Sequence, residues 1–62
     1  MSEEGDRAKA ARYRESAEAL RGIADTLRFD PRRQNQLRSL AGGFDRAANI
    51  IEQQLIKAQG KN

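Results

Sequence analysis

The sequence contains no cysteine and no histidine. Without cysteine, neither a disulfide nor a thiolate zinc site can form, and without histidine the remaining metal ligands are carboxylate and carbonyl oxygens. A chain of 62 residues buries little apolar surface, so it is comfortably stable only with a disulfide, a metal or a partner. With the first two set aside, we expect self-association or binding to a larger molecule, and no cofactor.

Long apolar runs are also absent. No stretch approaches the roughly 18 apolar residues of a membrane span. The opening Met-Ser-Glu-Glu-Gly-Asp is acidic and is not followed by the apolar segment of a signal peptide. The lack of cysteine is compatible with the cytoplasm. These features predict a soluble, cytoplasmic protein that does not act at a membrane.

Proline occurs once, at Pro31, and divides the chain. Proline is favoured in the first helical turn, Asp30 before it is a good N-cap, and a residue that precedes proline is pushed out of helical geometry. The sequence therefore predicts two helices, over residues 7–28 and 31–58, within a single domain that covers residues 1–62.

The predicted helix ends rest on weaker signals. Asp6 can cap the first helix, and Gly60 can act as a stop signal for the second. We accordingly expect residues 1–5 and 60–62 to be frayed.

Apolar residues in both predicted helices recur at alternating spacings of three and four, as along a coiled-coil seam. In the first helix they are Ala10, Tyr13, Ala17, Leu20, Ala24 and Leu27. In the second they are Leu37, Ala41, Phe44, Ala48, Ile51 and Leu55. Two such helices joined by a short turn fold back as an antiparallel hairpin, so the predicted fold class is all-α. Facing residues then have numbers that add up to about 61, which pairs a small residue with a large one in each layer.

A second row of apolar and small residues runs beside each seam, and the antiparallel arrangement brings the two rows to one side. We call this side the apolar face; its residues are Ser16, Leu20, Ile23, Leu27, Leu40, Gly43, Ala47 and Ile50. Exposed apolar faces mark interfaces. Pairing of two copies predicts a homodimeric four-helix bundle, and docking on a different helical protein is the alternative.

Two adjacent glycines interrupt the second helix. Each costs about 1 kcal/mol relative to alanine in a helix interior. Gly43 falls at the centre of the apolar face, where it lets another helix approach closely. Gly42 points away from that face, and no packing reason explains it.

Charged residues make up 34% of the chain, with a net charge of +3. Arginines recur every seven residues along one edge of the first helix, at Arg7, Arg14, Arg21 and Arg28. In the predicted register Asp45 lies near Arg14 and Glu52 near Arg7, so we expect most of this edge to form ion pairs.

The turn end is more basic. Five arginines converge there against Asp25 and Asp30; they are Arg21, Arg28, Arg32, Arg33 and Arg38. Such a cluster could bind RNA or DNA, which is the alternative function. The one aromatic residue nearby, Phe29, is expected to cover the end of the core instead of stacking on a base.

Catalysis finds little support in the sequence. Ser16 and Ser39 have no base to activate them, and Gly42 and Gly43 lack the pattern of a phosphate loop. We expect no enzymatic activity and no small-molecule substrate.

One resemblance adds to this interpretation. The segment Tyr-Arg-Glu-Ser-Ala-Glu-Ala-Leu-Arg-Gly-Ile-Ala (13–24), the Asp-Pro turn and Leu-Ala-Gly-Gly-Phe-Asp-Arg-Ala-Ala (40–48) resemble uncharacterised short helical-hairpin proteins of alphaproteobacteria. The resemblance implies a two-helix fold and no established activity. This chain departs from the family at Gly42 and Gly43, where we expect the other members to have long polar residues. Together with the residues, it predicts a small non-enzymatic interaction or regulatory protein.

Overall fold

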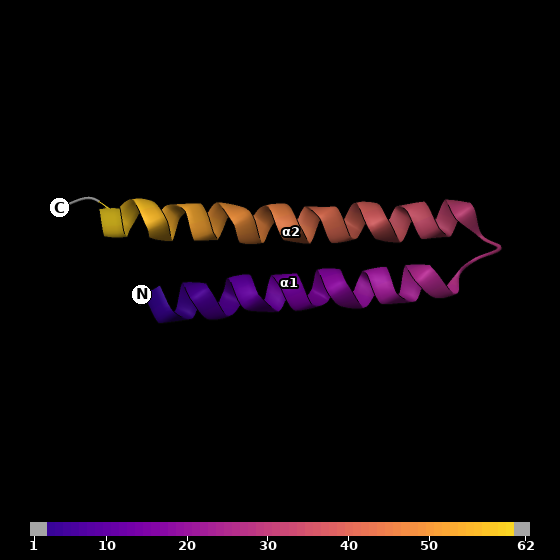
Figure 1. Ribbon diagram of the computed structural model, residues 1–62, viewed down its shortest axis with the longest axis horizontal. Coiled ribbons are helices and arrows are strands. Elements are labelled where there is room, and N and C mark those ends of the chain that lie inside the picture. The colour runs from indigo at the N-terminus through magenta and orange to yellow at the C-terminus, as the bar shows by residue number, and fades with distance from the viewer. Residues whose placement is uncertain (1–2, 61–62) are drawn as a thin grey trace.

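A computed structural model describes residues 3–60, apart from the side chains of residues 3, 4 and 60. It consists of two helices, α1 (Glu3–Thr26) and α2 (Pro31–Gly60). They lie side by side in opposite directions, joined by a tight turn, with the start of α1 and the end of α2 at the same end of the molecule (Figure 1). The predicted all-α antiparallel hairpin is confirmed.

The seam between the helices consists mainly of alanine. Buried apolar residues among those described recur every seven positions in each helix: Ala10, Ala17 and Ala24 in α1, and Ala41, Ala48 and Leu55 in α2. The other six predicted seam residues are half-buried. Among these, the Tyr13 and Phe44 rings pack against each other with centroids 5.8 Å apart. The seam residues are therefore those that the spacing predicts.

Contacts between the helices agree with the predicted register. Some join residues whose numbers add up to slightly less than 61, such as the hydrogen bond between the Gln34 side chain and the Ala24 carbonyl. Others exceed it, by two for the ion pair of Arg38 with Asp25 and by five for that of Arg14 with Glu52. Contacts on both sides of the predicted value agree with this register, because long arginine side chains reach more than one turn along a helix.

Hydrogen bonds fix the turn. The Asp30 carboxylate accepts a bond from the Arg33 backbone N–H at 3.1 Å, and the Asp30 carbonyl accepts one from the Gln34 N–H at 3.0 Å. Asp30 is thus the N-cap of α2, as predicted. At the end of α1, the Ala24 carbonyl accepts bonds from the Leu27 N–H and the Gln34 side-chain amide, at 3.0 and 2.9 Å. These bonds satisfy groups that a helix end leaves without helical partners.

The helix ends differ from the prediction. Helix α1 begins at Glu3 instead of residue 7, so Asp6 lies inside its first turn, where a carboxylate is favourable near the positive end of the helix dipole. It ends at Thr26, whose hydroxyl donates to the Ile23 carbonyl. Helix α2 continues through Gly60. Residues 3–5 and 60 are therefore helical; the rest of the predicted frayed ends, 1–2 and 61–62, lies outside the described residues.

We predict that Asp30→Ala lowers the free energy of unfolding by about 1 kcal/mol, because the Arg33 N–H loses its acceptor. Asp30→Asn retains a side-chain oxygen and should stay close to the parent. Urea unfolding followed by circular dichroism measures both. Equal losses in the two variants would show that the charge of Asp30, and not its capping bond, stabilises the turn.

Candidate interaction surfaces

The apolar face is exposed in the hairpin. Its three most prominent side chains, Ile23, Leu40 and Ile50, are 52%, 53% and 59% exposed. The other five members, Ser16, Leu20, Leu27, Gly43 and Ala47, are half-buried. The hairpin thus covers its own seam and leaves the neighbouring apolar row open to solvent.

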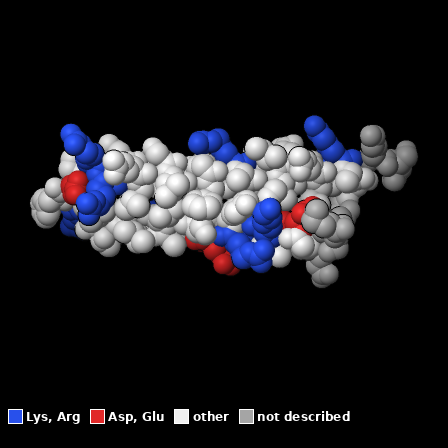
Figure 2. Space-filling view, turned by 180° about the vertical axis from the view of Figure 1, so that it is seen from behind, with Lys and Arg blue, Asp and Glu red and all other residues white. Residues whose placement is uncertain are grey.

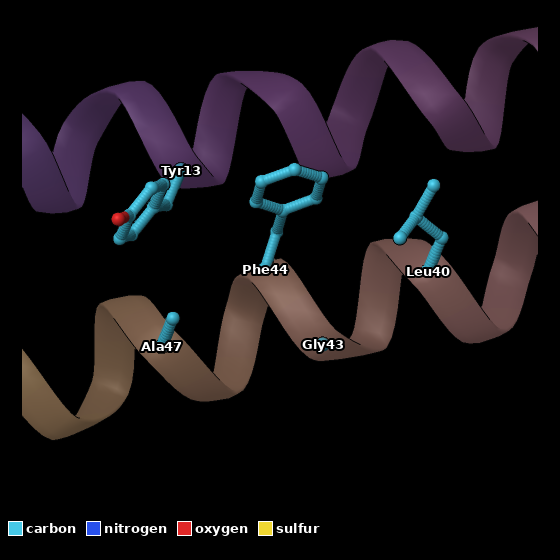
Figure 3. Close-up of a pocket in the computed structure, with 5 residues that line it drawn as sticks. All are labelled: Tyr13, Leu40, Gly43, Phe44 and Ala47. Carbon is cyan, nitrogen blue, oxygen red and sulfur yellow. The ribbon is translucent and has the colours of Figure 1, made fainter.

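Figure 2 shows this side as a broad band of uncharged residues along both helices, with Lys, Arg, Asp and Glu mainly at the turn end and along the two edges. In Figure 1, α1 lies below α2 and the turn is on the right. In Figure 3, α1 lies above α2, and Leu40, the labelled α2 residue nearest the turn in sequence, is on the right. Figure 3 therefore views the molecule from behind, as Figure 2 does. A band this low in charge is typical of a surface that becomes buried.

A shallow hollow of about 250 Å³ opens near the middle of this side. Its lining is Tyr13, Leu40, Gly43, Phe44 and Ala47 (Figure 3). The two rings and Leu40 rise around Gly43 and Ala47, which contribute almost no side chain. Four of the five lining residues come from α2, and Gly43 lies among them without a side chain.

Neither central glycine is required by the hairpin itself. Helix α2 runs through both without interruption, and no described glycine has a positive φ angle. A Cβ atom on Gly42 would lie 3.5 Å from the Arg46 side chain, and one on Gly43 would lie 3.9 Å from it. These are ordinary contacts, so an alanine fits at either position. Packing within the single hairpin therefore does not explain the glycine at position 43.

The opposite side of the seam carries ion pairs. Arg14 binds Glu52 through two hydrogen bonds, one of them from Nε at 3.2 Å, and lies 3.4 Å from Asp45. Arg21 binds the other oxygen of Asp45 at 2.5 Å. The predicted pairing of Asp45 with Arg14 is confirmed. Glu52 pairs with Arg14 instead of Arg7, although Arg7 and Glu52 line the same hollow near the open end.

This network shifts the pKa values of two of its side chains. The hydrogen bond from Arg14 lowers the pKa of Glu52 below its ordinary value, with partial opposition from desolvation. The same bond raises the pKa of Arg14. Both side chains are substantially exposed, so the pair orients the two helices more than it stabilises them.

More of the arginines at the basic turn end form ion pairs than the sequence indicates. Arg21 is directed to Asp45, Arg38 lies 3.3 Å from Asp25, and Arg33 lies 3.9 Å from Asp30. Among the described residues, the two remaining members of the cluster, Arg28 and Arg32, have no ion pair. The structure therefore reduces the five predicted anion contacts to two unpaired arginines and one weakly paired one.

Phe29 contradicts the sequence-based expectation. It does not cover the end of the core: it lies in the turn and is 98% exposed, the most exposed of the large apolar side chains described. Within the four-residue turn, the half-buried Leu27 lies at the end of the seam, and Phe29 is exposed to solvent. Its sequence neighbours offered a signal, since residues on both sides of it are charged.

The described part of the chain shows neither a metal site nor a membrane span. Among the side chains that the structure describes, those of residues 5–59, no three Asp or Glu groups gather in a way that could hold a metal ion. Neither helix, over the same residues, is long and apolar enough to cross a membrane.

Comparisons with protein families, curated proteins and solved structures found no match to this chain. The resemblance to alphaproteobacterial helical-hairpin proteins stays a prediction, and function has to be argued from the surfaces themselves.

We predict that the Arg14–Glu52 pair makes stability depend on acid pH. Because the pKa of Glu52 is lower in the folded state, the pair contributes its full stabilisation above the unfolded-state pKa and loses it as pH falls through the folded-state value. Glu52→Gln should therefore unfold with a weaker dependence on pH in this acid range. Thermal unfolding of both proteins as a function of pH tests this; parallel curves would contradict it.

Proposed function

We propose that this chain is a small non-enzymatic interaction module that pairs with a second copy of itself through the apolar face, forming a four-helix bundle. The observation that carries the proposal is the open hollow at Gly43 with Ile23, Leu40 and Ile50 exposed around it. Full burial of an isoleucine or leucine side chain is worth about 1.5–3 kcal/mol. Roughly half of that remains unrealised at each of these three positions.

The composition of the core supports the need for a partner. Five of the six buried apolar residues are alanines, and none of the large side chains described is fully buried. Alanine brings the helices close but removes little apolar area from water. A two-helix hairpin of this size therefore gains stability when a second apolar layer covers the first.

A second copy is favoured over a different protein because the apolar face carries both halves of a complementary contact. The hollow at Gly43 accepts a side chain, while Leu40 and Ile50 project on either side of it along α2. A two-fold axis through the hollow lets each copy place its projecting side chains against the other's small residues, as isologous interfaces require. The lack of cysteine is compatible with our proposal that this dimer acts in the cytoplasm.

The solution mass tests the proposal. The parent chain should have twice the 7.0 kDa mass of one copy, measured by sedimentation equilibrium. Ile50→Glu and Ile23→Glu should each weaken the dimer by more than about a hundredfold, because an unpaired carboxylate in an interface costs several kcal/mol.

Ile56→Glu is the matched control. Ile56 is 64% exposed on the same helix as Ile50 but lines the hollow that contains Glu52, on the ion-paired side. The control should keep the parent mass. A helical parent of 7.0 kDa at high concentration would refute the dimer, and dissociation by Ile56→Glu as strong as by Ile50→Glu would refute the choice of face.

The two glycines supply a further prediction. Gly43→Leu should weaken the dimer strongly because its side chain fills the hollow that the second copy uses, whereas Gly42→Leu should leave the mass unchanged. Both replace glycine in the same helix, so each gains about 0.8–1 kcal/mol of helix propensity. Dissociation measured over a dilution series separates them. Equal behaviour of the two variants would mean that Gly43 has no role in pairing.

A further inference from the structure

The turn end combines an exposed aromatic ring with unpaired positive charge. Phe29 is 98% exposed, and Arg28 precedes it directly. Arg32 follows in the first turn of α2. Of the described large apolar side chains that are more than half exposed, Phe29 is the one in the turn; Ile23, Leu40, Ile50 and Ile56 lie on the helices. Figure 2 shows Lys and Arg gathered at this end of the molecule.

Ion pairing leaves Arg28 and Arg32 as the unpaired arginines of the turn end among the described residues. Asp25 is engaged by Arg38, and Asp30 is held by the Arg33 backbone N–H. Neither carboxylate neutralises Arg28 or Arg32. The Arg33 side chain is 3.9 Å from Asp30 and is 70% exposed, so it can add to the positive field. Because Asp30 already occupies the capping bond of α2, an anion would be attracted by arginine side chains and not by the helix end.

We propose that the turn is a binding site for single-stranded nucleic acid, in which a base stacks on the Phe29 ring while Arg28 and Arg32 contact phosphates on either side of it. A fully exposed ring flanked by cations is the combination that sequence-tolerant single-strand binding uses. The base must be free to leave its neighbours, so a duplex does not fit this site. The site does not depend on the apolar face.

An anionic bilayer is a less suitable partner. Stable attachment to a lipid surface needs more than one apolar or charged signal, and Phe29 is the single apolar side chain that the turn exposes. Asp25 and Asp30 would also be carried towards a negative surface. A nucleotide strand, in contrast, can place its phosphates beside the arginines and its base on the ring.

The experiment uses fluorescently labelled uridine and thymidine oligonucleotides titrated with the parent protein at several salt concentrations. Two phosphate contacts predict that the logarithm of the binding constant falls with the logarithm of salt concentration with a slope of about −1.4. Removing one contact, in Arg28→Gln or Arg32→Gln, should bring the slope to about −0.7. Arg46→Gln is the matched control, since Arg46 also lacks an ion pair among the described residues but lies in the middle of α2.

The aromatic half of the site is tested by Phe29→Ala and Phe29→Leu. Both should weaken binding by about tenfold or more, because leucine retains the apolar surface but cannot stack. Since Phe29 makes almost no contact within the hairpin, both variants should unfold at the parent temperature.

Several results would each overturn the site. They are parent-like binding by Phe29→Leu, equal binding of duplex DNA, preferential binding to vesicles that contain phosphatidylserine, and an Arg46→Gln loss equal to that of Arg28→Gln. A fall to the single-chain mass in Phe29→Ala would likewise overturn it, because the ring would then belong to the contact between copies. Oligonucleotide binding that is retained in Ile50→Glu, after self-association is lost, would support a site that is independent of the apolar face.

Discussion

The close approach of two helices along alanine is the constraint from which the rest of the structure follows. At the centre of the seam, Ala17, Ala24, Ala41 and Ala48 are completely covered, which leaves no room for a larger side chain. The large apolar residues must therefore pack at the margins of the seam, where Tyr13 and Phe44 meet. Side chains at the margins of a two-helix layer are only half covered. The same small residues that hold the hairpin together thus also leave it incomplete.

The seam has two different sides because of the residues that flank it. On one side, four positions after Ala10 and Ala17, stand Arg14 and Arg21, whose ion pairs with Asp45 and Glu52 join α1 to α2. On the other side, one position before Ala17 and Ala24, stand the uncharged residues Ser16 and Ile23. The ion pairs join the two helices on one side, and the apolar residues on the opposite side stay exposed.

The sequence could predict the features that follow from periodicity. The spacing of apolar residues identifies all twelve seam positions, because a side chain's place on a helix depends only on its number. Asp30 before Pro31 identifies the turn, because both residues have strong local preferences. The same helical periodicity predicts the exposed apolar face around Gly43.

Other features depend on interactions that periodicity does not describe. Helix ends are set by small differences in free energy, so neither the start of α1 at Glu3 nor its end at Thr26 could be read from Asp6 or Asp30. Long side chains choose among several partners, which is why Glu52 binds Arg14 and not Arg7. The exposure of Phe29 depends on the backbone path of a four-residue turn, and an aromatic residue's usual preference for burial gave the wrong answer.

The two glycines show how an unfavourable residue can carry information. Within the hairpin, alanine would fit at position 42 and at position 43, and it would favour the helix by about 1 kcal/mol at each. The preference for glycine therefore cannot come from the hairpin. At position 43 the missing side chain opens a hollow between Leu40, Phe44 and Tyr13 on the uncharged side. Gly42 is not among the residues that line this hollow. A reason outside the hairpin is thus available to Gly43 alone, and it lies on the face where an apolar partner would gain the most area.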